Sequence, residues 1–238
     1  MKTNCQILAC CMLFCFLFIT CRSPAQIGIK GGAGISDIVF ANVGQTPYLG
    51  YEVDYLTHRF PSFSYQIGVC GTVKLHKHFD FHPELLLVKQ GLNYNIDFLY
   101  DDVKYKLNIW YIQLPLIINW KFRVEKKAQP NLFLGPYGAL KLAARRIKIY
   151  DGIDASDEMS NVKPYDIGLA GGFGYEFKMT SGKFIAEMRF NYSLVNIMEY
   201  ADGHISDYNG PEEERAKNLG LYLMAGYSFG NISKKKSK

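Results

Sequence analysis

The chain has 238 residues, of which 48% are hydrophobic and 15% aromatic, and its formal net charge is +5. This charge is too mild to indicate a nucleic-acid partner, and the composition suits one all-β domain. No window of the sequence holds the roughly 20 consecutive apolar residues that a transmembrane helix needs.

The N-terminal segment, residues 1–25, has the features of a cleaved secretory signal peptide. Lys2 forms a short basic region, residues 7–19 are an uncharged apolar run, and residues 23–25 resemble a small-residue cleavage site. The mature chain is therefore expected to begin at Gln26.

The cysteines are concentrated in the same segment. Five of the six lie within it, so the mature chain keeps only Cys70 and is expected to form no internal disulfide. A lipoprotein cleavage before Cys21 is the alternative for the N-terminus, but Thr20 stands where a small residue is expected.

Eight segments of the mature chain alternate between an apolar parity and a small or polar parity. Such a period of two predicts β-strands with two different faces. The predicted strands are 26–36, 63–75, 79–91, 107–122, 132–145, 165–177, 183–194 and 218–229.

The segment 107–122 shows most clearly where the apolar faces point. Pro115 in its middle argues against a helix. Its apolar parity begins at Trp110 and reaches Trp120, and ten residues at ~3.3 Å each, tilted by ~45°, separate these two indoles by about 23 Å along a membrane normal. That separation is close to the ~25 Å apolar band of an outer-membrane barrel, so Trp110 and Trp120 are predicted to lie in its aromatic girdles.

The connections between these strands alternate between long and short. The long ones are net acidic, with Glu212, Glu213 and Glu214 in the last, whereas the turns and the lysine-rich tail 230–238 are basic. Whether residues 48–55 extend a strand or form a small hairpin stays open. The predicted domains are the signal peptide at 1–25, a barrel at 26–229 and a basic periplasmic tail at 230–238.

These patterns predict an all-β fold: an eight-stranded antiparallel up-and-down transmembrane β-barrel in the cell outer membrane, with long outer loops and short periplasmic turns. A soluble lipocalin-like barrel is the rival. Its outside would be rich in Lys and Glu, whereas the less apolar parity here is mainly Gly, Ala, Ser and Tyr with few charges.

Charged residues on the small-residue parity are predicted to face the lumen. Side chains just fill the interior of an eight-stranded barrel, so these charges must pair to offset their desolvation. We interpret them as a structural network rather than a catalytic or transport site. The predicted lumen charge network is Lys30, Lys74, Asp80, Glu84, Lys121, Lys141, Glu176, Glu187 and Arg189.

No motif predicts an enzyme, a cofactor or a metal centre. His82 lies between Asp80 and Glu84 on one parity, but no motif supplies a nucleophile. The acidic stretch 151–158 could hold calcium but lacks the EF-hand spacing, and His204 lies near carboxylates without a serine motif. A solvated loop is the preferred interpretation of both. The glycine-rich stretches follow no strand-to-helix transition, so they do not predict phosphate loops.

Five segments in register resemble the PorT-type outer-membrane β-barrel family of the Bacteroidetes. They are GIKGGAGIS from Gly28, HPELLLVKQGLNY from His82, YIQLPLIINWKF from Tyr111, GLAGGFGYEF from Gly168 and MRFNYSLVNI from Met188. Outer-membrane barrels usually end on an aromatic residue, whereas this chain continues beyond its last one, Phe229, into the lysine tail.

The PorT resemblance implies an accessory role in protein secretion across the outer membrane, within the type IX machinery. The expected partners are outer-membrane lipid and a periplasmic or secretion-machinery protein that the basic tail could reach. A structural or adhesive barrel of the OmpX kind is the alternative, and a surface hydrolase is less favoured.

Overall fold

The alternating segments form β-strands in the computed structural model, which describes residues 26–41, 57–97, 102–122, 126–150, 153–198 and 215–230. The strands are β1 (Gln26–Ala41), β2 (Thr57–Lys74), β3 (Phe79–Asp97), β4 (Asp102–Lys121), β5 (Ala128–Tyr150), β6 (Ile153–Glu158), β7 (Tyr165–Met179), β8 (Gly182–Ser193) and β9 (Arg215–Phe229). The predicted signal peptide and most of the predicted tail lie outside the described residues.

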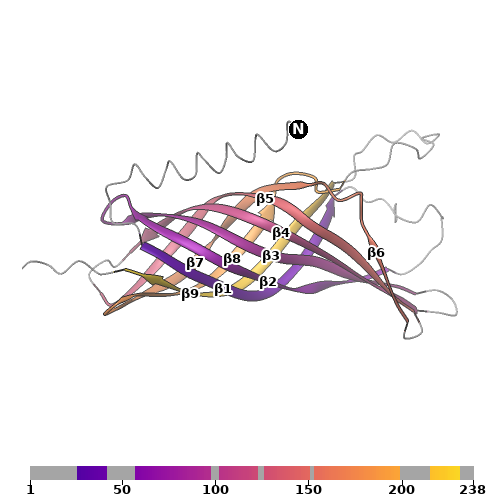
Figure 1. The fold of residues 1–238 in the computed structure, drawn as a ribbon, viewed down its shortest axis with the longest axis horizontal. Coiled ribbons are helices and arrows are strands. Elements are labelled where there is room, and N and C mark those ends of the chain that lie inside the picture. The colour runs from indigo at the N-terminus through magenta and orange to yellow at the C-terminus, as the bar shows by residue number, and fades with distance from the viewer. Residues whose placement is uncertain are drawn as a thin grey trace, which may run out of the picture.

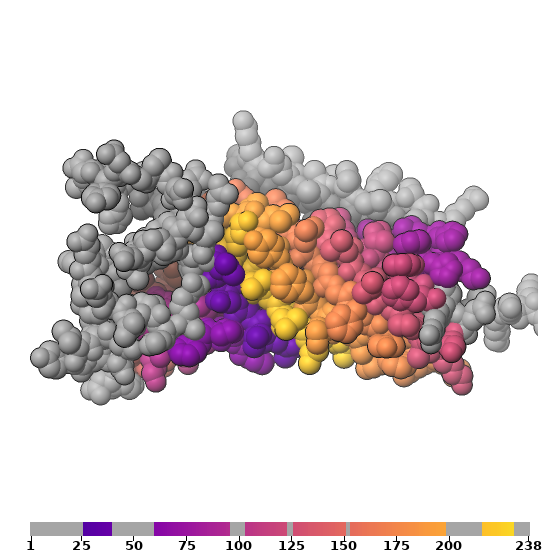
Figure 2. Space-filling view, turned by 180° about the vertical axis from the view of Figure 1, so that it is seen from behind, coloured from indigo at the N-terminus to yellow at the C-terminus, as the bar shows by residue number. Residues whose placement is uncertain are grey.

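Eight of these strands close into a barrel (Figure 1). Each pairs antiparallel with its neighbours, in the order β1-β2-β3-β4-β5-β7-β8-β9. The first and last strands close the ring over a long register, from Ile27 opposite Phe229 to Ala41 opposite Arg215. Figure 2 shows this seam from behind, with yellow β9 beside indigo β1. The predicted eight-stranded antiparallel barrel is confirmed.

At the end opposite the short turns, the strands run further than the sequence pattern indicated. β3 continues to Asp97 and β4 begins at Asp102, so both extend into the connection between the predicted strands 79–91 and 107–122. The connection between the predicted strands 132–145 and 165–177 contains β6, which pairs with the end of β5 from Arg145–Glu158 to Tyr150–Ile153. In these two places, strand includes residues that the sequence pattern assigned to connections. A ribbon of β3–β6 extends beyond the barrel wall instead (Figure 1). Residues 48–55 lie outside the described part of the chain.

The strand extensions have their apolar side chains on the inner face, which is the reverse of the lipid-facing band. Leu92, Leu107 and Ile109 are buried in one hydrophobic cluster, whereas Lys104 and Lys106 on the other parity are exposed. Above the lipid band the outside of the sheet meets water, so the polarity of the two faces is exchanged. The period of two persists, but its apolar parity now faces inward.

A β-bulge on β5 also changes which residues face the lumen. Tyr111 lies opposite Lys141 and Trp110 lies opposite Ala143, so one residue of β5 is left over between them. An extra residue moves every later side chain to the other face. Arg145 lies four residues after Lys141, so strict alternation would place it on the lumen parity, but beyond the bulge it is exposed.

The outer wall of the barrel is apolar over the predicted lipid band. Ile29 is 56% exposed, Leu134 61% and Leu223 65%, and similar side chains occur on the other strands. Lipid would cover this surface in a membrane, because exposed apolar area on this scale is not tolerated in water. Within the described residues, no helix combines the length and the apolar character needed to cross a membrane.

Candidate functional site: the lumen of the barrel

A first group of charges, the central cluster, crosses the lumen between opposite walls. It consists of Lys30 on β1, Glu84 on β3, and Glu187 and Arg189 on β8. Arg189 donates two hydrogen bonds to Glu84, of 2.6 and 2.9 Å. β3 and β8 are separated by three strands round an eight-stranded ring, so this bidentate pair joins opposite sides of the barrel.

Lys30 and Glu187 complete the central cluster. The Lys30 ammonium lies 2.6 Å from a Glu84 oxygen and 3.0 Å from a Glu187 oxygen. A Glu187 oxygen also lies 2.6 Å from Arg189, whose guanidinium lies 5.5 Å from the centre of the Phe133 ring. Two cations thus meet two carboxylates whose side chains are at most 6% exposed.

A second group, the turn-side cluster, lies nearer the short turns. It consists of Asp80, His82, Lys121, Glu176 and Lys183, from β3, β4, β7 and β8. Lys121 pairs with Asp80 and lies 2.9 Å from Glu176, while Lys183 lies 3.1 Å from Glu176 and 3.7 Å from Asp80. Two carboxylates again face two ammonium groups. Removing one partner from such a buried set would leave an uncompensated charge.

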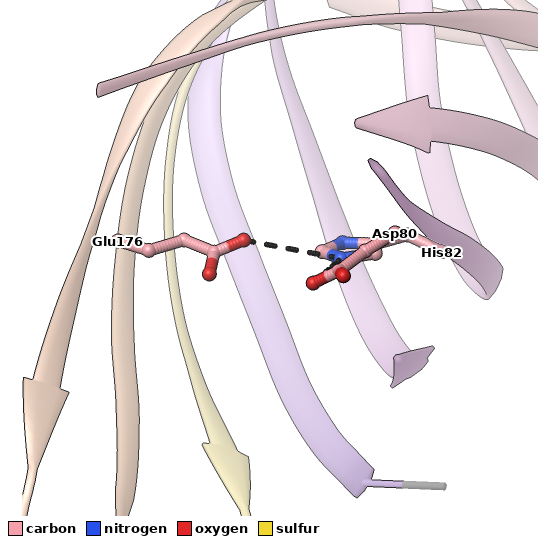
Figure 3. A group of neighbouring side chains, drawn as sticks. All are labelled: Asp80, His82 and Glu176. Atoms are coloured by element: carbon pink, nitrogen blue, oxygen red, sulfur yellow. Dashed lines mark ion pairs between the residues drawn. The ribbon is translucent and has the colours of Figure 1, made fainter. Parts of the chain in front are cut away.

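Asp80, His82 and Glu176 lie close enough together to be compared with the ligands of a metal ion (Figure 3). His82 Nε2 lies 3.8 Å from an Asp80 oxygen and 3.9 Å from a Glu176 oxygen, and potential ligand atoms of the three residues lie within 4.8 Å of one another. However, Lys121 and Lys183 already neutralise both carboxylates. A divalent cation would add charge to a balanced site, so the geometry favours an ion-pair network over a metal centre.

A third group, the outer polar cluster, surrounds Asp166 on β7. Ser193 donates a hydrogen bond of 2.5 Å to this buried carboxylate, Asn218 one of 2.9 Å and Tyr137 one of 3.3 Å. Asn218 also donates to the Tyr111 hydroxyl at 3.3 Å. The Asp166 carboxyl is thus held by neutral donors from β5, β8 and β9.

The structure brings together seven of the nine residues predicted for the lumen network. The central cluster holds Lys30, Glu84, Glu187 and Arg189, and the turn-side cluster holds Asp80, Lys121 and Glu176. The structure does not bring Lys74 or Lys141 into these two clusters. Lys74 is the last residue of β2 and is exposed at the rim, while Lys141, beside the bulge, donates a hydrogen bond to the Val162 carbonyl.

The predicted network omitted three residues of the lumen clusters, namely Lys183, His82 and Asp166. All three lie on the small-residue parity of their strands, which placed His82 beside Asp80 and Glu84 and could also have identified Lys183 and Asp166. His82 was grouped in the sequence with Asp80 and Glu84. In the structure it faces Asp80 and Glu176, whereas Glu84 belongs to the central cluster.

The two tryptophans lie on the outward parity of β4. Trp120 is 45% exposed and contacts Phe79 and Phe122, with ring centroids 6.4 and 4.5 Å away. Trp110 is half-buried beside the bulge, opposite Lys89 on β3. Aromatic side chains therefore gather on the outer wall around Trp120, near the short turns.

Side chains fill the lumen at each of these levels. Between the central and turn-side clusters, a small cavity lined by Lys30, His82, Asn119 and Glu176 leaves about 10 Å³ for the centre of a water molecule. That is room for about one water. Towards the extended strands, buried apolar residues such as Ile38, Leu86 and Ile109 form the hydrophobic core.

Comparison with known proteins identifies one family model and several solved structures. A family model described as "Outer membrane protein beta-barrel domain" matches residues 20–199. No curated protein matches the chain. Among solved structures, OprG from Pseudomonas aeruginosa is 16% identical with a TM-score of 0.45, and the match covers 87% of this chain and 97% of that chain.

Two further solved structures are similar at lower identity. Neisserial surface protein A is 12% identical with a TM-score of 0.39, over 86% of this chain and 99% of that chain. Ail of Yersinia pestis, in complex with the heparin analogue sucrose octasulfate, is 13% identical with a TM-score of 0.36, over 87% and 99%. On the family match, the chain belongs to the outer membrane protein beta-barrel domain family and lies in the outer membrane.

Proposed function

We propose that this protein is a non-enzymatic, non-conducting barrel that works through its surfaces, as a structural or adhesive protein of the outer membrane. The observation that carries this proposal is the set of side chains that crosses the lumen, above all the bidentate pair of Arg189 and Glu84. A lumen filled in this way offers no wide path for solutes. The surfaces at the two ends and along the wall remain for function.

The surface best placed to contact other cells or molecules is the ribbon beyond the barrel wall. All six residues of β6 are exposed, and Ile153 is 71% exposed. β6 is also the end strand of the sheet, so one of its edges has no neighbouring strand among the described residues. An unpaired edge can accept an extended segment of another protein through backbone hydrogen bonds.

The test replaces residues 147–156 with the dipeptide Asn-Gly. Because Ile147 lies opposite Ser156, this deletion shortens the hairpin in register and leaves the Arg146–Asp157 pair beside the new turn. We expect a heterologous Gram-negative host that displays the intact protein to adhere to surfaces or to other cells, and the shortened variant to lose this adhesion while it still folds. Equal adhesion by the two proteins would contradict an adhesive role for the ribbon.

A role in protein export is a second candidate. It is supported by the resemblance to PorT and by lysines near the short turns, namely Lys74, Lys77, Lys126, Lys127 and Lys178. The two described carboxylates at this level, Asp80 and Glu176, are buried in the turn-side cluster. This end therefore offers positive charge to an acidic periplasmic partner.

Deleting the gene in the native host and measuring the delivery of secreted proteins to the cell surface tests this second role. The export role predicts retention of cargo in the periplasm, reversed by the intact gene. It also predicts weaker rescue by a gene with Lys77, Lys126 and Lys127 changed to Gln. Normal delivery in the deletion strain would remove this candidate and leave the adhesive or structural role.

A further inference from the structure

We propose that the outward face of β3, β4 and β5, just above the apolar band, binds the phosphate groups of an outer-leaflet glycolipid. The cations of this face, which we name the outer basic patch, are Lys89, Lys104, Lys106 and Arg145. They belong neither to the lumen clusters nor to the basic end near the short turns.

The strand register places all four cations on the same side of the sheet as Trp110. Lys89 lies directly opposite Trp110 across β3 and β4. Lys104 and Lys106 share the parity of Trp110 on β4, and Arg145 lies opposite Asn108 on that parity. Opposite residues in an antiparallel pair point to the same face, so the patch continues the lipid-facing wall. Lys104, Lys106 and Arg145 are exposed, and Lys89 is half-buried.

The height of the patch matches the headgroup layer of a membrane. Trp120 and Trp110 bracket the apolar band, with exposed Ile112 and Leu140 between the two levels. A strand tilted by ~45° rises about 2.3 Å per residue, so Lys106 and Lys104 lie about 9 and 14 Å above Trp110. Lys89 lies near the level of Trp110 itself. The cations therefore begin where the apolar wall ends.

Up to the level of Lys104, the charge balance on this face favours an anion. Among the side chains that the structure describes on the outward face of the ribbon, the carboxylates are Glu158, opposite Arg145, and Asp154, opposite Ile149. Four cations thus face two carboxylates below the tip of the β3–β4 hairpin, where the register pairs Asp97 with Asp102. Lys89 also donates a 3.3 Å hydrogen bond to the Phe63 carbonyl, which places its ammonium along the wall.

A lipid phosphate fits this position better than a soluble anion, because the patch is continuous with a surface that lipid covers. Lysine and arginine next to an apolar surface place their stems along the lipid and their charges among the headgroups. Arginine adds a planar fork that binds phosphate through two hydrogen bonds. The occupant that meets both conditions is a phosphorylated glycolipid, whose acyl chains lie against Ile112 and Leu140.

The test compares lipid retention by the refolded full chain in nanodiscs that contain either diphosphoryl lipid A or the same lipid without phosphates. After extraction into mild detergent, bound lipid is counted by native mass spectrometry. We expect at least tenfold preferential retention of the phosphorylated lipid, since each cation near an anionic surface contributes on the order of fivefold in affinity. Equal retention of the two lipids by the unchanged protein would overturn the proposal, whatever the variants do.

Two triple variants locate the effect. Lys89→Gln, Lys106→Gln and Arg145→Gln together should reduce the preference to no more than about fivefold, which is the contribution of the remaining Lys104. Lys77→Gln, Lys126→Gln and Lys127→Gln, which remove the same charge at the opposite end, should leave it unchanged. An equal loss in the two triple variants would show a general charge effect and contradict the patch. A further measurement adds sucrose octasulfate, a soluble anion, to the protein in phosphate-free nanodiscs. Binding of this anion as strong as that of the phosphorylated lipid would contradict lipid as the occupant.

Discussion

At the scale of single residues, the lumen is organised by charges that meet across the barrel. Parity along each strand predicted which residues point inward for seven of the nine network members. It could not predict their partners, because Glu84 and Arg189 are 105 residues apart and meet only when the ring of strands closes. Lys74 and Lys141 were predicted for the network but lie outside its clusters for local reasons, because Lys74 ends β2 and Lys141 binds the Val162 carbonyl beside the bulge of β5.

The first prediction concerns Glu84. Glu84→Gln keeps the size of the side chain but removes the charge that Lys30 and Arg189 share. We expect a loss of about 3–5 kcal/mol in the free energy of unfolding, because breaking a buried ion pair leaves the partner charge uncompensated. Urea unfolding in lipid vesicles, followed by tryptophan fluorescence, measures this loss.

Asp157→Asn is the matched control for Glu84→Gln. It removes one carboxylate from the pair with Arg146, whose two side chains are 42% and 65% exposed and whose charged atoms lie 3.7 Å apart. An exposed pair of this kind contributes about 0–1 kcal/mol. Equal losses in the two variants would contradict a stabilising role for the central cluster.

The second prediction concerns the seam between β1 and β9. A Cβ atom on Gly34 would lie 1.9 Å from the Leu221 carbonyl oxygen, whereas one on Gly138 would meet nothing within 4 Å. Gly34→Ala should therefore oppose closure of the barrel, and Gly138→Ala should not. The folded fraction, measured as the heat-modifiable band in semi-native gels, should fall only for Gly34→Ala. A normal band for that variant would show that the seam adjusts without cost.

At the scale of elements, the sequence predicted all eight barrel strands but ended several of them too early. In the sequence analysis, the apolar residues of each strand were assigned to the outward side, which faces lipid. Above the lipid band, the same strands have apolar residues inward and polar residues outward. Leu107 and Lys104 illustrate this exchange, since Leu107 is 3% exposed and Lys104 is exposed. β6 was missed because its hairpin with β5 carries charges on both strands, and such a segment resembles a solvated loop.

The third prediction tests this exchange of faces. Leu107→Ala should lower the free energy of unfolding by about 2–5 kcal/mol, because it removes a buried side chain from a packed cluster. Lys104→Ala on the opposite face of the same strand should change it by less than about 0.5 kcal/mol. The comparison uses the same unfolding measurement in vesicles. A larger effect at Lys104 would mean that the extended hairpin has the opposite orientation.

At the scale of the whole molecule, layers of different chemistry fill the lumen of the barrel. The turn-side and central clusters fill the half nearer the short turns with ion pairs, and the apolar core fills the half nearer the extended strands. The sequence predicted the charges but not the apolar layer, because the inward parity was assigned to small and polar residues. This filling is the observation behind the proposed role through surface contacts.

The conductance of the refolded full chain in planar lipid bilayers tests whether the lumen is closed to solutes. We expect a flat baseline without porin-sized steps, both for the unchanged protein and for Lys74→Gln, whose exposed side chain lies outside the lumen clusters. The interior of an eight-stranded barrel has room for side chains but not for an aqueous channel besides. Reproducible steps of porin size from protein with a normal heat-modifiable band would contradict the closed lumen, and with it a function confined to the surfaces of the barrel.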